Sequence, residues 1–210
     1  MSSTTDFHRL ADTGWSITQI QRLGVDARGK TLTVDGIVGP KTLGGTYLDP
    51  ATVEHELVQV ALKELLAGAR EQGGNNAGEW VAKYVRKPHV ERRKYGAWCA
   101  AFVSWCLREA YGAGTPYILG ARRLVNRLRK AYTPVALEDI QVGDVIAWKR
   151  TSRTTQYAGH VGIVAHVDDE IIMTIEGNSG PRGAVRVWAY DRHDPSRGAT
   201  GPLWGIGRLT

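Results

Sequence analysis

The chain has 210 residues, a net charge of +6 and 42% hydrophobic residues, which is enough apolar material for a core and excludes global disorder. No apolar run approaches the ~20 residues of a membrane-spanning helix. The opening segment, MSSTTDFHRLADTGW, lacks the basic and apolar regions of a secretory signal peptide. We therefore expect a globular protein made in a cytoplasm, which another factor must release if its substrate lies outside.

The positive charge is unevenly distributed along the chain. Residues 1–50 carry five basic and five acidic groups, whereas residues 86–130 carry eleven basic and two acidic groups. Such a surface suits nucleic acid, an anionic membrane or an anionic cell-wall polymer, and it also fits solvated helix faces. Because no nucleic-acid motif accompanies the charge, we expect no nucleic-acid partner.

The first fifty residues predict a small helical unit. Ser16 can cap a short helix at 17–23, which Gly24 ends. Turn-forming pairs follow in the segment 32–44, where a proline at position 40 suits the first turn of another helix. A cluster of turn residues at 44–50 coincides with the change in charge, so we place a domain boundary there, between residues 1–50 and 51–210.

The second part of the chain predicts helices followed by strands. Apolar residues at helical spacing and flanking turn residues indicate four helices, at 52–72, 77–86, 98–111 and 120–131. Alternating β-branched residues then indicate four strands, at 144–148, 160–167, 170–177 and 184–190. This order favours an α+β domain in which the helices pack on one antiparallel sheet.

The two cysteines differ in their expected roles. Cys99 and Cys106 lie seven residues apart in one predicted helix, about 10.5 Å along its axis, which exceeds the roughly 7 Å limit for a disulfide. Both thiols should therefore be free. Cys99 stands at the helix start, where the helix dipole favours the thiolate, whereas Cys106 has bulky neighbours and should be a buried structural thiol.

A base and its orienting group are candidates on two later strands. His160 opens one strand within GHVGIV, and Glu176 and Asn178 end the next within IEGNS. Strand side chains alternate, so the last two should share a face, and either could hold the histidine. Cysteine, histidine and an acid or amide form the set that a thiolate hydrolase needs. Trp98, beside the nucleophile, is expected to line the substrate groove.

Taken in order, the segments AWCAAFVSW, GDVIAW, GHVGIV and IEGN resemble the CHAP family of peptidoglycan amidases and peptidases. The resemblance covers roughly residues 55–208. It implies a papain-like fold in which Cys99 is the nucleophile, His160 the base, Glu176 its orienting group and Asn178 an auxiliary polar group. Some members bind calcium through acids that flank the nucleophile. Here two alanines follow Cys99, so we expect no metal and no cofactor.

The stretch DGIVGPKT at 35–42 resembles the short helical peptidoglycan-binding module. We therefore expect a modular, monomeric cell-wall hydrolase whose partner is peptidoglycan, without membrane insertion. A phage endolysin made in the host cytoplasm is the favoured context. An injected antibacterial effector or a virion-associated lysin would use the same chemistry, and a non-catalytic wall-binding protein is the rival from another class. Whether an amidase or an endopeptidase bond is cut stays open.

Overall fold

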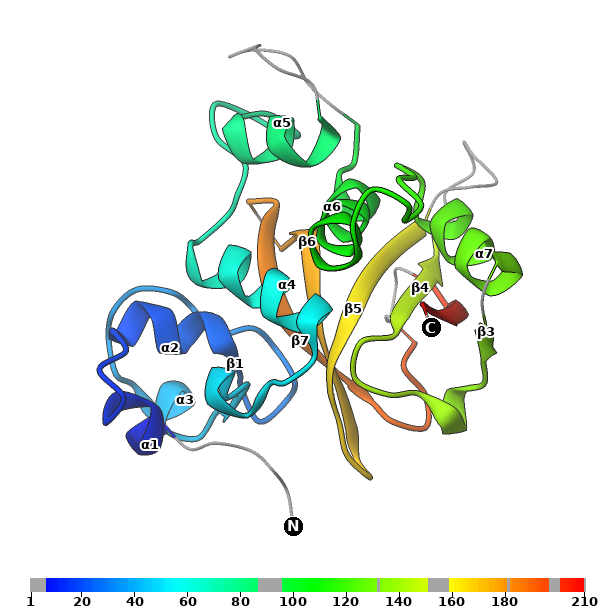
Figure 1. Ribbon diagram of the computed structural model, residues 1–210. Helices are drawn as coiled ribbons and strands as arrows, with labels where there is room; N and C mark the ends of the chain where they lie inside the picture. The colour runs from blue at the N-terminus through cyan, green and yellow to red at the C-terminus, as the bar shows by residue number, and fades with distance from the viewer. Residues whose placement is uncertain are drawn as a thin grey trace.

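The protein is described by a computed structural model, in which a six-stranded antiparallel sheet carries helices on one face (Figure 1). The described residues are 7–86, 96–131, 133–150, 159–180, 182–196 and 201–209. The fold is of the expected α+β class. No helix of this described part is both long and apolar enough to pass through a membrane.

The sheet is built from strands β3 to β8 in the order β3-β8-β4-β5-β6-β7. The strands are β3 (Thr133–Val135), β4 (Val145–Lys149), β5 (Gly159–Val167), β6 (Ile171–Ser179), β7 (Ala184–Asp191) and β8 (Leu203–Arg208). The four strands predicted from alternation are all present and form the β4–β7 meander. The short β3 and the glycine-interrupted β8 were not predicted.

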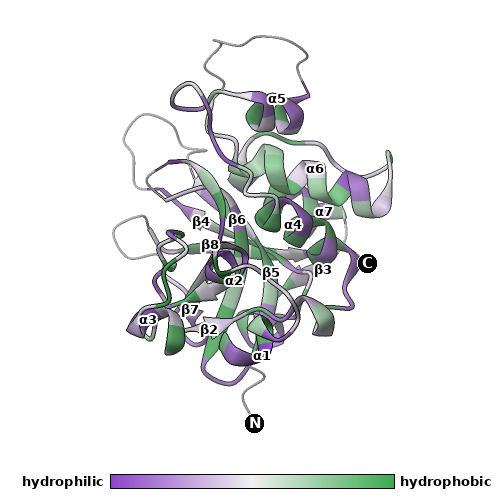
Figure 2. Ribbon diagram, turned by 90° about the vertical axis from the view of Figure 1, so that its left-hand side faces the viewer, coloured by the Kyte–Doolittle hydropathy of each residue, from purple (hydrophilic) through white to green (hydrophobic). Residues whose placement is uncertain are grey.

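Alternate residues of these strands divide between two apolar clusters. One face, with residues such as Val161, Ile163 and Ile175, joins the helices in the main core. The other face holds a smaller cluster that includes Trp148 and Tyr190. The buried residues of this cluster come from the strands and from Ile140, before β4. Figure 2 shows the apolar colouring of the central strands where the helices cover them. The sheet therefore has a helix-covered face and a second, differently covered face.

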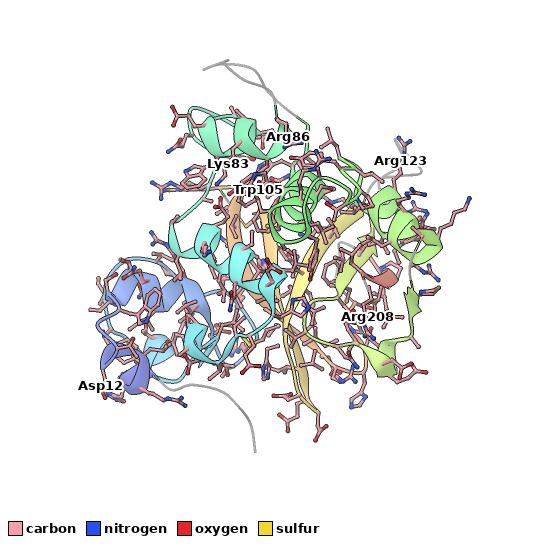
Figure 3. The ribbon with its side chains drawn as sticks, in the orientation of Figure 1. Asp12, Lys83, Arg86, Trp105, Arg123 and Arg208 are labelled. Carbon is pink, nitrogen blue, oxygen red and sulfur yellow. The ribbon has the colours of Figure 1, made fainter. Side chains whose placement is uncertain are left out.

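Four helices follow the predicted order: α4 (Glu56–Leu66), α5 (Glu79–Val85), α6 (Cys99–Tyr111) and α7 (Ala121–Ala131). The first is shorter than the predicted 52–72. Pro50–Thr52 form a separate 3-10 turn, and Gly68, at φ +75°, adopts the left-handed conformation that ends helices. The Lys83 Nζ atom lies 4.1 Å from the centre of the Trp105 ring, and this cation–π contact joins α5 to α6 (Figure 3).

The N-terminal part contains α1 (Phe7–Ala11), α2 (Ile17–Leu23), α3 (Pro40–Leu43) and the short paired strands β1 (Gly24–Val25) and β2 (Thr46–Tyr47). Ser16 forms a capping box with Gln19, as its position predicts. Ile20 and Leu23 are fully buried in the same cluster as residues of α4. These elements lie beside α4 and β7 (Figure 1). The domain boundary near residue 50 stays a prediction.

Candidate active site

Cys99 is the first residue of α6 and is buried, with 3% of its surface exposed. Both cysteines are free, as the helical spacing predicts. Burial alone would raise the pKa of the Cys99 thiol, but the neighbouring His160 and the backbone N–H of Ala100 favour the thiolate. The balance places the pKa of Cys99 below its ordinary value. The side chain therefore has the electrostatic surroundings of a nucleophile.

His160 lies between Cys99 and Glu176. Its Nε2 atom is 2.8 Å from Glu176 Oε2. The other ring nitrogen, Nδ1, is buried and bonds to no nitrogen or oxygen of the described residues, and the imidazole interacts with the Cys99 thiol. Burial opposes the charged ring, but Glu176 and Cys99 outweigh it and raise the pKa of His160. Opposite shifts in the two partners favour a thiolate–imidazolium pair.

Glu176 has no exposed surface and is surrounded by hydrogen-bond donors. Besides the histidine, its carboxylate accepts from Thr174 Oγ1 at 2.9 Å, Tyr190 Oη at 2.6 Å and Ser179 Oγ at 3.3 Å. The indole of Trp188 donates in turn to Ser179 at 2.6 Å. Such a network offsets the cost of burying a carboxylate and fixes the oxygen that faces the histidine.

Gly162 makes this arrangement possible. A Cβ atom at Gly162 would lie 2.8 Å from Cγ of Glu176, closer than two carbons can approach without a shift. The glycine in GHVGIV therefore leaves the space that the Glu176 side chain fills on the neighbouring strand. The motif thus has a steric reason as well as a chemical one.

Asn178 does not share the position of Glu176. The strand register shifts between Glu176 and Ser179, and Asn178 has φ +54°. Its amide, oriented to satisfy both ends, donates to Glu71 Oε1 and accepts from the Trp98 backbone N–H, each at 3.2 Å. The expectation that Glu176 and Asn178 share a face is therefore wrong, because the register shift breaks the alternation of side chains along β6. Of the two candidates, Glu176 contacts the histidine and Asn178 contacts Trp98, the residue before Cys99.

Trp98 does not line an open groove, which corrects the expectation. It is 0% exposed, its ring stacks on Tyr84 with centroids 5.4 Å apart, and its indole N–H donates to Glu71 Oε1 at 3.0 Å. A tryptophan beside a nucleophile can serve either as a surface platform or as an anchor for the helix start. Because its ring face and its indole N–H both have partners inside the protein, Trp98 anchors the start of the helix.

Cys106 occupies the structural position that its neighbours predict. It is fully buried in the main core, and burial together with the nearby Glu64 raises its pKa well above the ordinary value. A thiol in this setting stays protonated at neutral pH. The two cysteines of one helix therefore have opposite electrostatic surroundings.

Several site residues carried no readable signal in the sequence. Tyr190, Thr174 and Ser179 reach Glu176 only through strand register, and Glu71 reaches Trp98 from a polar loop. Pairing β6 with β7 could have indicated Tyr190, since alternate residues of paired strands share a face. Glu71 depends on a loop conformation that no periodicity reports.

The part of the chain that the structure describes contains no group of three or more histidine, cysteine, aspartate or glutamate side chains that could hold a metal ion. His166 lies at the far end of β5, beyond a register shift that pairs it with Met173 of the main core, so its even number does not place it on the face of His160. Its Nε2 is 3.2 Å from Asp168 Oδ2. This contact joins the last part of β5 to the turn that follows it, away from the candidate site, as the position of His166 predicts.

Of the comparisons with known proteins, the match to a family model agrees with the motifs. Residues 89–178 match the family model described as CHAP domain. A search of curated protein sequences finds no match. A crystal structure from Staphylococcus aureus, described as similar to a lipoprotein of the NLP/P60 family, has a TM-score of 0.43 and 22% identity.

The alignment with that structure covers 80% of this chain and 45% of the other, so this chain spans less than half of that protein's length. A likeness at this score assigns neither fold nor function. The family match includes Cys99, His160, Glu176 and Asn178. Residues 89–178 of this chain are therefore similar to the CHAP domain, the family that the motifs around Cys99 resemble.

Proposed function

We propose that this protein hydrolyses amide bonds of bacterial peptidoglycan, with the Cys99 thiolate as nucleophile. The observation that carries the proposal is the buried imidazole of His160, which bonds to Glu176 through Nε2 and interacts with Cys99. This connected arrangement, inside a CHAP domain, has the parts that acyl transfer to a thiol requires. A wall-binding protein without catalysis would need no such pair.

The reaction follows from the arrangement in two steps. The Cys99 sulfur attacks the amide carbonyl carbon, and the electron pair of the C=O bond moves onto oxygen. The C–N bond then breaks as the His160 imidazolium gives its proton to the leaving amine. In the second step His160 takes a proton from water, the hydroxide attacks the thioester, and the acid is released with the thiolate restored.

The Cys99 backbone N–H is placed to assist the first step. The first N–H groups of an α-helix have no partner within the helix, and Cys99 begins α6. A donor of this kind can stabilise the negative oxygen of the tetrahedral intermediate. Glu176, which stays ionised in this scheme, stabilises the imidazolium through the 2.8 Å contact.

The favoured biological context is host-cell lysis by a phage endolysin, with a stem-peptide or cross-bridge bond as the target. The resemblance of 35–42 to a wall-binding module supports this context, because an endolysin combines binding and cleavage. An injected effector or a virion-associated lysin would use the same site. The muropeptides released by the full chain distinguish an amidase, which frees the glycan from the peptide, from an endopeptidase, which cuts within the peptide.

The decisive experiment incubates the full chain with purified peptidoglycan and measures new free amino groups, followed by mass spectrometry of the products. Cys99→Ala is the matched inactive variant, and Cys106→Ser is the control that keeps the proposed nucleophile. We expect release by the wild type and by Cys106→Ser, and none by folded Cys99→Ala. Wild-type sedimentation with the wall without amine release would instead support the non-catalytic alternative.

A further inference from the structure

The loop after α4 is fixed to the start of β7. The Val185 N–H donates to the Ala69 carbonyl at 2.8 Å, and the Glu71 N–H donates to the Gly183 carbonyl at 2.9 Å. Between these two hydrogen bonds, Arg70 forms an antiparallel β-bridge with Ala184, the first residue of β7. The backbone of Glu71 is therefore held by the same sheet that carries the site histidine.

The Glu71 carboxylate closes a ring of three hydrogen bonds with Trp98 and Asn178. Its Oε1 accepts from the Trp98 indole at 3.0 Å and from the Asn178 amide at 3.2 Å, while the Asn178 oxygen accepts from the Trp98 backbone N–H at 3.2 Å. Gly183 leaves room for this carboxylate, since a Cβ there would lie 2.3 Å from Glu71 Cδ. Both polar groups of Trp98 that donate hydrogen bonds are thus bound.

The ring matters because Trp98 immediately precedes the nucleophile. The peptide unit that joins Trp98 to Cys99 carries the Cys99 N–H, which is the donor for the carbonyl oxygen in the proposed reaction. A fully buried indole, stacked on Tyr84, and a bound backbone N–H restrict the orientation of that unit. Donors of this kind are effective only when they are held in place before the reaction.

We propose that Glu71 is a positioning residue, which acts through Trp98 and Asn178 to orient the oxyanion-donating peptide at the start of α6. The inference rests on the proposed function for its catalytic consequence. Glu71 lies before the segment 89–178 that matches the family model, so the working site extends beyond that segment. Asn178 then belongs to this ring, on the nucleophile's side of the site.

The arrangement gives Glu71 a distinctive kinetic signature. Its carboxylate bonds to Trp98 and Asn178, and the Cys99 thiolate is favoured by His160 instead, so removal of Glu71 should leave the thiolate–imidazolium pair intact. Alkylation of Cys99 needs the thiolate and no oxyanion donor. Loss of Glu71 should therefore lower kcat for amide cleavage much more than it lowers the rate of alkylation.

The test compares Glu71→Ala and Glu71→Gln in a Cys106→Ser background. Glutamine keeps an oxygen that can accept from both donors, and Glu170→Gln, at the distant β5–β6 turn, is the matched control. Three readouts are taken: kcat and KM on soluble muropeptides, the pH profile of iodoacetamide alkylation, and hydrogen exchange of the peptide that covers residues 96–101. We expect Glu71→Ala to reduce kcat by about tenfold to a hundredfold, which is less than the roughly hundredfold to thousandfold loss for removal of an oxyanion donor, because the Cys99 N–H is kept.

In Glu71→Ala the pH profile of alkylation should stay unchanged and the Trp98 amide should exchange faster. Glu71→Gln should recover most of the kcat and most of the slow exchange at Trp98. Unchanged kcat and unchanged exchange in Glu71→Ala would overturn the proposal. A fall in alkylation that parallels the fall in kcat would also overturn it, since the effect would then lie in the thiolate. If the parent chain itself cleaves nothing, the proposed function fails. The Trp98 exchange data then still decide whether Glu71 holds this segment.

Discussion

At the scale of single residues, the candidate site depends on a carboxylate that has no contact with solvent. Glu176 is 0% exposed and accepts hydrogen bonds from three residues besides the histidine. Hydrogen bonds to a buried charge are stronger than those between neutral groups, and each unmade bond is costly. The position of His160 is thus set by a network and by the packing around it.

Replacing Glu176 by glutamine should therefore lower kcat/KM on the order of a hundredfold, in the range for a misplaced catalytic base. Glutamine keeps an acceptor for Tyr190 but loses the charge that stabilises the imidazolium. Asn178→Ala should cost less, and about as much as Glu71→Ala, because Asn178 contacts Trp98 and Glu71 and not the histidine. Steady-state kinetics on muropeptides measures both, with Asp168→Asn as the control for an analogous pair far from the site. Equal losses in the two site variants would contradict the assignment.

The paired pKa shifts predict a definite pH dependence. The pKa of Cys99 is lowered and that of His160 is raised, so the ion pair is lost when falling pH protonates the thiolate or rising pH deprotonates the ring. In a Cys106→Ser background, iodoacetamide should modify Cys99 well below the pH at which an ordinary thiol reacts.

The rate of Cys99 alkylation should fall at low pH, where the thiolate becomes protonated. In His160→Ala this fall should begin at a higher pH, because burial raises the pKa of Cys99 and His160 is the largest influence that lowers it. The alkylation rate between pH 5 and pH 9 checks the shift. If the alkylation rate of His160→Ala falls at the same pH as that of the parent, another group stabilises the thiolate. The folded state of the variant is confirmed by its thermal transition.

At the scale of helices and strands, chain order and periodicity predicted most of what is seen. The helix start at Cys99 and the strands around His160 and Glu176 follow from apolar spacing and β-branched residues. What the alternation could not report was the shift of register after Glu176, which depends on a left-handed residue at Asn178. The candidate residues therefore lie on the expected helix and strands, while the surroundings of Asn178 depend on a local irregularity.

The contact between α6 and β6 gives a testable steric requirement. A Cβ at Gly177 would lie 2.6 Å from Cβ of Phe102 and 2.9 Å from the Trp98 ring. Gly177→Ala should push the nucleophile helix away from the sheet, at a cost of about 1–3 kcal/mol in stability, and lower the activity. Gly114→Ala, where the new atom meets open space, is the control. Urea unfolding and cleavage assays on both variants measure the effect.

At the scale of the whole molecule, the distribution of charge predicts how the protein meets its substrate. Helix α7 buries Leu124 and Leu128 and exposes basic residues that include Arg127 and Lys130. Figure 3 places Arg123 on this same helix, far from Asp12 of the N-terminal part. Exposed charges act over roughly 8–10 Å at about 0.1–0.15 M salt, so salt should weaken attraction to an anionic wall.

Lytic activity on whole walls should therefore fall as salt rises, while turnover of a small neutral peptide should change little. The double variant Arg127→Ala/Lys130→Ala should reduce wall lysis at low salt and flatten its salt dependence. Turbidity assays on walls and peptide assays in the same buffers provide the comparison. Parallel salt curves for the two substrates would remove electrostatic attraction as the cause.

The packing of the N-terminal part against β7 also bears on how the chain avoids self-association. In the described sheet β7 is an edge strand, and edges with unpaired backbone groups invite strands of other molecules. Residue Gly29 of the N-terminal part lies against the Ala189 carbonyl, and Thr31 contacts Arg186. In a chain shortened to residues 51–210, residues 69–71 would still pair with the start of β7. The rest of this strand would be uncovered together with the apolar side of α4, so the first defect of the shortened chain in solution should be aggregation.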